Sequence, residues 1–292
     1  MLISVITPTY NRAYILNKCY ESLVNQTSKE FEWVVVDDGS SDNTEELVNS
    51  FIAEGKITIK YIKQQNGGKH IAHNTAVLNS SGDLVVCLDS DDVLTENAVE
   101  CAVSFWEKNA KLYNTGILAK RGDMVERKPI CAELPQGVKE CTMFDLTNKH
   151  GFFGDTILYF RRELLEKNLF KSFEGERFIP ETNMYIEIDK HGTMLLLDEV
   201  LYLCEYLPDG LTAKFHQLLE RNPNGTADTY YKQMCMATDF KTKLKYAVLT
   251  NIYKSLSKNK KELQFNENKG LLFISSVPAR LVKNKFLSKF ER

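Results

Sequence analysis

The sequence contains no apolar run near the roughly 20 residues that a helix needs to cross a bilayer. The apolar stretch at residues 2–8 is shorter still and lacks the basic flank of a signal peptide, which argues against export. The seven cysteines include no CxxC pair, so neither a disulfide framework nor a zinc site is indicated. We therefore expect a cytoplasmic protein with reduced thiols.

Two nucleotide-binding fingerprints are also missing. No GxGxxG follows the first predicted strand, and no GxxxxGK[ST] occurs anywhere. These absences exclude the usual dinucleotide fingerprint and the P-loop. With 292 residues, 43% of them hydrophobic, the chain is still long enough for a substantial core, as one large domain or one domain with an appendage.

Predicted strands and helices alternate over the first 90 residues. Apolar runs predict strands, and apolar side chains at helical spacing predict a helix after each of the first three. The predicted strands are residues 3–7, 31–36, 57–62 and 84–88. Asp42 and Glu45 resemble a capping box that opens the second helix, with Ile52 on its buried face. Such alternation predicts an α/β fold with a mostly parallel central sheet and flanking helices.

Polar residues follow three of these predicted strands, at residues 8–12, 37–40 and 89–92. The carboxyl ends of parallel strands meet at one edge of a sheet, so we expect these residues to converge. Asp89, Asp91 and Asp92 would repel one another unless a cation lay among them, and their hard oxygen atoms favour Mg²⁺ or Mn²⁺. Alternatively, they decorate a loop or cap the following helix.

Four segments, in order and spacing, resemble family 2 glycosyltransferases with the Rossmann-like GT-A fold. They are Ser4-Val5-Ile6-Thr7-Pro8-Thr9-Tyr10-Asn11-Arg12, Val34-Val35-Val36-Asp37-Asp38-Gly39-Ser40-Ser41-Asp42, Asn66-Gly67-Gly68 with Ala72-His73-Asn74, and Leu88-Asp89-Ser90-Asp91-Asp92. The resemblance covers about the first 110 residues. It implies a nucleotide-sugar-binding half at 1–110, an acceptor-binding half at 111–215, and a helical, basic extension at 216–292.

The resemblance also implies a uridine site. Tyr10 would stack on the uracil ring, with the Pro8 backbone beside it, and Asp38 would accept a hydrogen bond from uracil N3–H. Lys69 would meet the diphosphate oxygens as a point charge. The alternatives are that Tyr10 packs in the core beside the first helix, that Asp37 faces the sheet or holds a loop, and that Lys69 is only solvated.

Further roles follow for the acidic motif. Asp89 and Asp91 would hold Mn²⁺ or Mg²⁺, with Asp91 the first choice for direct coordination. Ser90 and Arg12 would contribute to the donor site. Asp92 would contact the sugar, or it would hold the metal ligands in position without binding the metal itself.

An inverting transfer needs a base for the acceptor hydroxyl. The resemblance places it at the start of a helix, where many family members carry an acidic pair that this sequence lacks. The sequence has Pro180-Glu181 there, so we expect Glu181 to be the base, with Glu187 and Asp189 as fallback candidates. Alternatively, Glu181 only complements the helix dipole.

The second half of the chain is less informative. Residues 115–145 have the composition of a variable insertion. Residues 156–160 predict a strand on the acceptor side, residues 200–206 a late strand, and residues 209–212 a turn into helices.

The last part of the chain differs in charge. The net charge is −2, yet residues 240–292 contain thirteen Lys or Arg against three Glu, so the preceding residues are acidic. Apolar residues among these lysines predict an amphipathic helix. It would dock on anionic lipid, or it would form a helical subdomain with solvated lysines. No nucleic-acid recognition motif accompanies the charge.

We therefore predict an inverting transferase that moves a sugar from a UDP-sugar to a glycan or lipid-linked glycan in polysaccharide, for example capsule, biosynthesis. It would be cytoplasmic, or peripheral at the inner face of the membrane. One alternative is a transferase-like module that binds nucleotide sugars without turnover, and a weaker one is a metal-dependent nucleotidyltransferase. The motifs specify neither sugar nor acceptor, because pocket shape outside them selects both.

Overall fold

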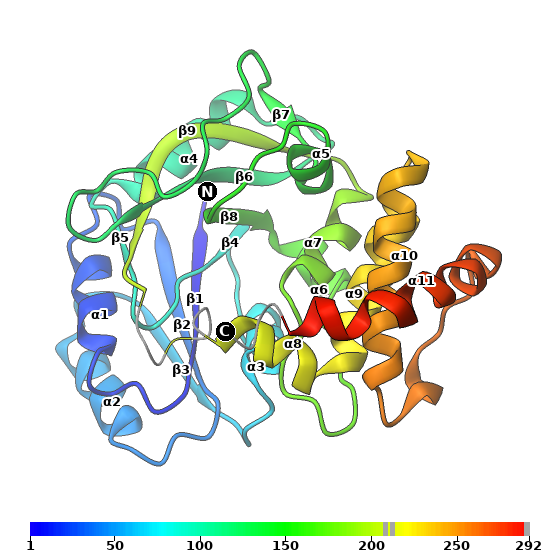
Figure 1. The fold of residues 1–292 in the computed structure, drawn as a ribbon. Helices are drawn as coiled ribbons and strands as arrows, with labels where there is room; N and C mark the ends of the chain where they lie inside the picture. The colour runs from blue at the N-terminus through cyan, green and yellow to red at the C-terminus, as the bar shows by residue number, and fades with distance from the viewer. Residues whose placement is uncertain (207–209, 211–213, 289–292) are drawn as a thin grey trace. The chain divides into compact units, whose positions relative to one another are not determined.

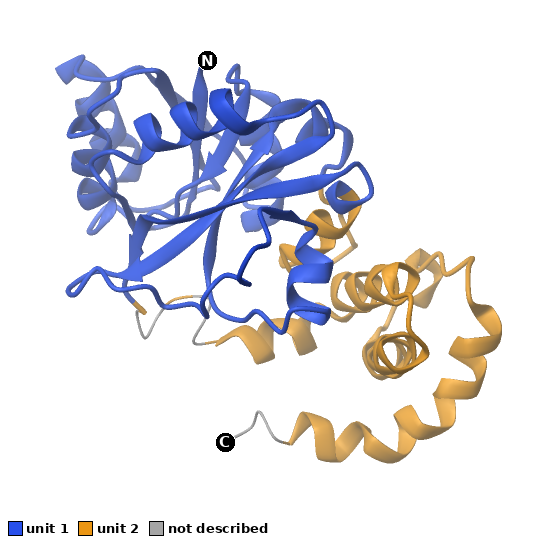
Figure 2. Cartoon of the chain, turned by 90° about the horizontal axis from the view of Figure 1, so that it is seen from above, with its two compact units in different colours: residues 1–169, 188–205 blue, residues 170–187, 206–292 orange. Residues whose placement is uncertain are grey.

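The computed structural model describes residues 1–206, 210 and 214–288. The chain forms two compact units, which Figure 2 colours separately. Unit 1 comprises residues 1–169 and 188–205, and unit 2 comprises residues 170–187 and 206–292. The predicted division at residues 110 and 215 is a functional one and stays a prediction. Of the turn predicted at 209–212, only Gly210 is among the described residues.

Unit 1 is built on one sheet, which has nine strands within the described residues. The strands are β1 (Ile3–Thr9), β2 (Phe31–Asp37), β3 (Ile59–Lys63), β4 (Leu84–Cys87), β5 (Val93–Leu94), β6 (Asn114–Asp123), β7 (Glu140–Cys141), β8 (Thr156–Arg161) and β9 (Thr193–Cys204). Their order is β3-β2-β1-β4-β8-β6-β9-β5, and β7 pairs with β9. β1 to β4 run parallel, whereas β8 lies antiparallel between β4 and β6.

Helices cover both faces of this sheet (Figure 1). They are α1 (Leu16–Val24), α2 (Thr44–Glu54), α3 (Lys69–Leu78), α4 (Ala98–Asn109), α5 (Met143–Asn148) and α6 (Arg162–Lys167). α1, α2 and α4 share one apolar core with Val5, Trp33 and Val86 of the sheet. Since side chains alternate along a strand, Ile6 and Val34 point to the opposite face, where α3 lies against β1 and β2. The predicted α/β fold with a central sheet and flanking helices is confirmed. The sheet is less parallel than predicted, because β8 pairs antiparallel with β4 and β6, and β5 and β7 pair antiparallel with β9.

The predicted opening of α2 is wrong in detail. Asn43, not Asp42, occupies the N-cap and makes no side-chain capping bond. Asp42 instead accepts from the backbone N–H of Ala13, in the loop after β1, and from Thr44, the first residue of α2. Ile52, expected on the buried face, is 41% exposed.

The expected insertion at 115–145 is also wrong for its first part. Residues 114–123 form β6, a central strand between β8 and β9. Gly116 interrupts the apolar run, so the strand was not predicted. The close pairing of β6 with β8 requires this glycine, because a Cβ there would lie 1.9 Å from the Tyr159 carbonyl oxygen. The residues after β6 are irregular up to β7, with isolated bridges at Pro129 and Cys131.

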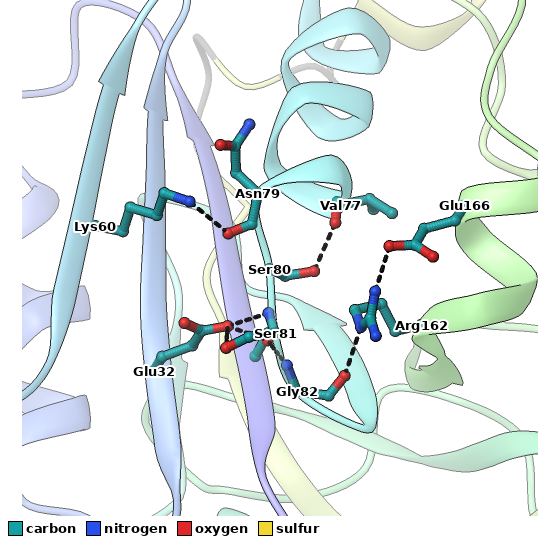
Figure 3. A network of polar contacts seen from close by, with 10 residues as sticks. Glu32, Lys60, Val77, Asn79, Ser80, Ser81, Gly82, Arg162 and Glu166 are labelled. Carbon is teal, nitrogen blue, oxygen red and sulfur yellow. Dashed lines mark hydrogen bonds and ion pairs between the residues drawn. The ribbon is translucent and has the colours of Figure 1, made fainter.

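A polar network holds the amino end of β4 (Figure 3). Ser4 and Ser81 donate to Glu32, and the Gly82 N–H donates to the Ser4 hydroxyl at 2.8 Å. Arg162 donates to the Gly82 carbonyl at 3.0 Å. The network fixes where β4 begins and therefore where its polar carboxyl end emerges.

Unit 2 is helical. It contains most of α7 (Thr182–Asp189), followed by α8 (Phe215–Arg221), α9 (Pro223–Met236), α10 (Phe240–Leu256), a 3₁₀ turn (Lys260–Glu262) and α11 (Lys269–Leu287). Its core includes Leu219, Ala227, Tyr253 and Ala279. The helical, basic extension is confirmed. None of the described helices is long and apolar enough to cross a membrane.

Candidate active site

The loops after β1 and β2 are tied together. Asn11 donates its backbone N–H to the Ser40 hydroxyl at 2.8 Å, and its side-chain oxygen accepts from the Ser41 N–H at 2.8 Å. The Ala13 N–H donates to Asp42 at 3.0 Å. Two of the three predicted polar strand ends therefore meet at one edge of the sheet.

Asp37 and Asp38 end β2 and serve different partners. Asp37 is fully buried and accepts from the Ser40 N–H and the Tyr61 hydroxyl, both at 2.7 Å, as expected for a residue that holds a loop. Asp38 accepts from the N–H groups of Gly67 and Gly68, at 2.9 and 2.8 Å, and from Gln64. It therefore fixes the loop that leads into α3.

Tyr10 lies at the carboxyl end of β1, where its side chain is 50% exposed. The alternative that it packs in the core beside the first helix is therefore wrong. Pro8 is buried two positions earlier and pairs with Val36 of β2. Arg12 is partly exposed and hydrogen-bonds the Tyr14 hydroxyl. An aromatic face and a guanidinium are thus presented at the same strand end.

Lys69 connects α3 to the acidic motif. It is the first residue of α3, and its ammonium lies 2.6 Å from Oδ1 of Asp89. Both side chains are about one quarter exposed, so the pair is reachable by a ligand. The α3 loop, already bound to Asp38, therefore also meets the end of β4.

The aspartates after β4 crowd one another. Burial raises the pKa of Asp91, the Asp89 carboxylate raises it further, and the charges of Arg12 and Lys69 oppose the shift. Burial and the Asp89 charge raise the pKa of Asp92 to about 7. Ser90 is buried between them. The motif concentrates negative charge that nearby Arg and Lys side chains neutralise only in part.

Two residues that the sequence did not single out support this motif. The Tyr202 hydroxyl donates to Asp92 at 2.7 Å and accepts from the Asp89 N–H at 3.1 Å. The Arg121 guanidinium lies 4.2 Å from the centre of the Tyr202 ring. Tyr202 lies in β9, more than a hundred positions after the motif, and Arg121 lies in β6, about thirty positions after it. No local sequence pattern therefore connects either residue to the motif.

The acidic motif offers few side chains to a metal ion. Among the described residues, no group of three or more His, Cys, Asp or Glu side chains is placed to hold a metal. A smaller donor set is sufficient for Mg²⁺, which proteins commonly hold by one or two carboxylates plus substrate phosphates. Asp89 and Asp91, whose negative charges repel each other, fit an arrangement in which two carboxylates and the substrate phosphates hold the ion.

Glu181 lies in unit 2, directly before the first residue of α7. It is exposed and accepts from the Tyr185 hydroxyl at 2.9 Å. Of the fallback candidates, Asp189 is 6% exposed and accepts from the N–H groups of Met143 and Phe144, so it serves the start of α5.

A polar cluster in unit 2 holds α7 against α9. Asn183 donates to Asp228 and Thr229, both at 3.0 Å, and accepts from the Lys232 ammonium at 2.8 Å. Lys232 also pairs with Glu187 at 3.3 Å. Glu187 is therefore engaged in this cluster, whereas Glu181 stands outside it.

Curated relatives of this chain are glycosyltransferases. The GalNAc(5)-diNAcBac-PP-undecaprenol β-1,3-glucosyltransferase of Campylobacter jejuni is 26% identical over 302 residues, which cover 96% of this chain and 95% of that protein. Several other relatives match over shorter stretches, which span only 14% to 51% of their own lengths.

Solved structures share the fold. Staphylococcus aureus TarS 1–349 in complex with UDP-GlcNAc has a TM-score of 0.63 at 16% identity, covering 98% of this chain and 92% of that one. Glucosyl-3-phosphoglycerate synthase from Mycobacterium tuberculosis, with Mn²⁺, UDP and glucosyl-3-phosphoglycerate, has a TM-score of 0.53 at 19% identity, covering 82% and 81%. The fold is therefore GT-A, as predicted.

The family model described as glycosyl transferase family 2 matches residues 4–169. The match contains all four predicted motifs and extends past residue 110, where the recognised resemblance ended. Because it covers more than half of the chain, the chain belongs to glycosyl transferase family 2.

Proposed function

We propose that this glycosyltransferase moves a sugar from a UDP-sugar to a glycan acceptor with inversion at the anomeric carbon. One observation carries the proposal: Asp38, Lys69 and Asp89 are joined through the α3 loop at one edge of the sheet, beside the exposed ring of Tyr10. An aromatic surface that can stack, a carboxylate that can accept from a base N–H and an ammonium that can meet phosphate thus lie at one edge of the sheet.

Each donor group has a defined task. Tyr10 stacks on the uracil, and Pro8 lines the ring's edge. An ionised carboxylate offers about four lone-pair sites, and Asp38 uses three of them for the α3 loop. The remaining site accepts from uracil N3–H, which cytosine lacks. Lys69 exchanges Asp89 for a diphosphate oxygen when the donor binds.

The acidic motif and the base act at the reacting bond. Asp89 and Asp91 would hold Mn²⁺ or Mg²⁺, which would supply positive charge for the departing diphosphate. Arg12 and Ser90 keep that diphosphate in place. The acceptor hydroxyl oxygen bonds to the anomeric carbon as the bond to the diphosphate oxygen breaks, and Glu181 takes the hydroxyl proton.

We propose a lipid-linked glycan as acceptor and the inner face of the cell membrane as the place of action. The undecaprenol-linked acceptor in the name of the Campylobacter relative supports the first point. The seven cysteines are all free, which suits a reducing compartment. The basic extension over residues 240–292 suits an anionic surface. We propose polysaccharide synthesis, for example of a capsule, as the process that such an acceptor would serve.

Calorimetric titration with UDP tests the donor site. We expect UDP to bind with Mn²⁺ present, and we expect Asp91→Asn to weaken that binding at least tenfold. An unchanged affinity in Asp91→Asn would remove the acidic motif from the donor site. If UDP binds and no member of a panel of UDP-sugars is consumed with lipid-linked glycans, the chain is a binding module instead.

A further inference from the structure

The last helix, α11, exposes an apolar face. Phe273 is 80% exposed, Ile274 67%, Val277 62% and Leu281 80%. Residues 273, 277 and 281 follow one another at four-residue spacing, so they form one stripe along the helix, with Ile274 beside it. We call these four residues the α11 stripe. The folding of unit 2 does not explain why four large apolar side chains on one helix are this exposed, because the hydrophobic effect favours burying them.

The opposite face of α11 is already used. Leu272, Ser275 and Ala279 are buried. Asn251 of α10 donates to the Leu272 carbonyl at 2.7 Å and to the Ser275 hydroxyl at 2.9 Å. The helix is thus fixed within unit 2 by its inner face, and the α11 stripe is left for a partner.

The charges on α11 and α10 have one sign. α11 contains four Lys or Arg and no Asp or Glu, and α10 contains four Lys and no acidic residue. On the α11 wheel, Lys269 and Arg280 flank one side of the stripe and Lys285 the other. An apolar stripe between rows of basic side chains is the pattern of helices that lie in the plane of a membrane interface.

Charge also argues against a second copy as the occupant. A symmetric dimer brings the same patch together from both chains, so it would oppose two sets of four basic side chains without an acidic partner on α11. A surface of anionic lipid complements both the apolar stripe and the basic rows.

We propose that α11 lies on an anionic lipid surface and inserts Phe273, Ile274, Val277 and Leu281 among the acyl chains. The proposal rests on the proposed function for its purpose, because insertion brings the enzyme to a lipid-linked acceptor. The inserted helix is α11, and its apolar contacts with the acyl chains contribute to binding in addition to the charge of its lysines and arginine.

Vesicle sedimentation of the full chain tests this. We expect binding to vesicles of phosphatidylcholine with phosphatidylglycerol, and at least tenfold weaker binding for the double variant Phe273→Ser with Leu281→Ser. Leu112→Ser is the matched control, because Leu112 is 89% exposed in unit 1, and it should bind as wild type does. Salt at about 0.5 M should weaken binding without abolishing it. Equal sedimentation of wild type and the double variant would overturn the proposal.

Fluorescence gives a readout that does not depend on affinity. Phe273→Trp should shift its emission to the blue on adding anionic vesicles, and no shift would count against insertion. A dimer in light scattering that the double variant dissociates, with no vesicle binding by wild type, would assign the stripe to a second copy. UDP titration of the same variants separates the two proposals. If the double variant loses lipid binding and keeps its UDP affinity, the result bears on the role of α11 alone. If wild type does not bind UDP, the proposed donor site is wrong whatever α11 does.

Discussion

Asp89, Asp91 and Asp92 lie within four consecutive positions, yet each carboxylate has different surroundings. Asp89 pairs with Lys69, and Asp92 is buried and accepts from Tyr202. Asp91 is partly exposed, and burial and Asp89 raise its pKa. Under the proposed function, a cation held by Asp91 and Asp89 would relieve the repulsion between their two carboxylates.

Asp38→Asn should weaken UDP binding at least about tenfold. An asparagine side chain has one acceptor oxygen, so it cannot accept from both the Gly67 and Gly68 N–H groups and the uracil. A lost hydrogen bond to a charged group is worth about 1.5–3 kcal/mol, and about 1.4 kcal/mol is tenfold in affinity. Calorimetry measures the change, and an unchanged dissociation constant would contradict the role of Asp38.

Glu181→Gln should lower kcat by about 10² to 10⁴ and leave UDP affinity unchanged, because an amide cannot take the acceptor proton. UDP release measures turnover. Glu46→Gln is the matched control, since Glu46 is an exposed glutamate in the first turn of α2, and it should turn over as wild type does. Normal turnover in Glu181→Gln would reject Glu181 as the base.

At the scale of elements, the turn between α3 and β4 sets where the acidic motif emerges. Gly82→Ala should lower the melting temperature, because the new Cβ would lie 2.6 Å from the Ser4 backbone nitrogen and would displace the network of Figure 3. We expect a loss of about 1–3 kcal/mol. Gly270→Ala is the control, since no described atom outside its own stretch of α11 lies within 4 Å of its Cβ position, and it should not destabilise. Equal melting temperatures in both variants would disprove the constraint.

The start of α5 should make stability depend on pH. Burial raises the pKa of Asp189 to about 6, although two backbone N–H groups oppose the shift, and the unfolded value is about 3.9. Between these values the folded chain binds more protons, so the free energy of unfolding falls as pH rises, by up to about 3 kcal/mol. Asp189→Asn should remove this contribution.

Urea titrations at pH 4, 5, 6 and 7 measure the Asp189 contribution. The unfolding free energy of Asp189→Asn minus that of wild type should grow from about pH 4 to about pH 6 and level off above that. A difference that stays constant with pH would show that Asp189 does not titrate in this way.

The elements were predictable where the pattern was local. The first strands and helices alternate with clear apolar periodicity, and the polar motifs after the strands predicted where the candidate site lies. β6 was missed because Gly116 and the polar residues at its ends break the apolar run. Tyr202 and Arg121 were missed because their link to Asp92 exists only after β6 and β9 pair. Local chemistry is readable in sequence, whereas support supplied by distant strands is not.

For the whole molecule, nucleotide and metal should act together. Mn²⁺ with UDP at about a hundred times the dissociation constant adds about 2.7 kcal/mol, so the melting temperature should rise by roughly 5 °C. EDTA should remove most of that rise, because Asp89 and Asp91 would then hold no cation to supply positive charge to the diphosphate. Thermal shift measures both, and an equal rise with EDTA would indicate a donor site that needs no metal.

The antiparallel direction of β8 has a consequence for specificity. Leu84 pairs with Arg161 and Val86 with Tyr159, so beside the end of β4 lies the beginning of β8, preceded by residues 151–155. Residues 151–155 therefore lie beside the acidic motif that the proposed function places at the reaction centre. Under the proposed function, substitutions in this stretch would change which acceptor fits and would leave Asp38 and Lys69 in place for the donor.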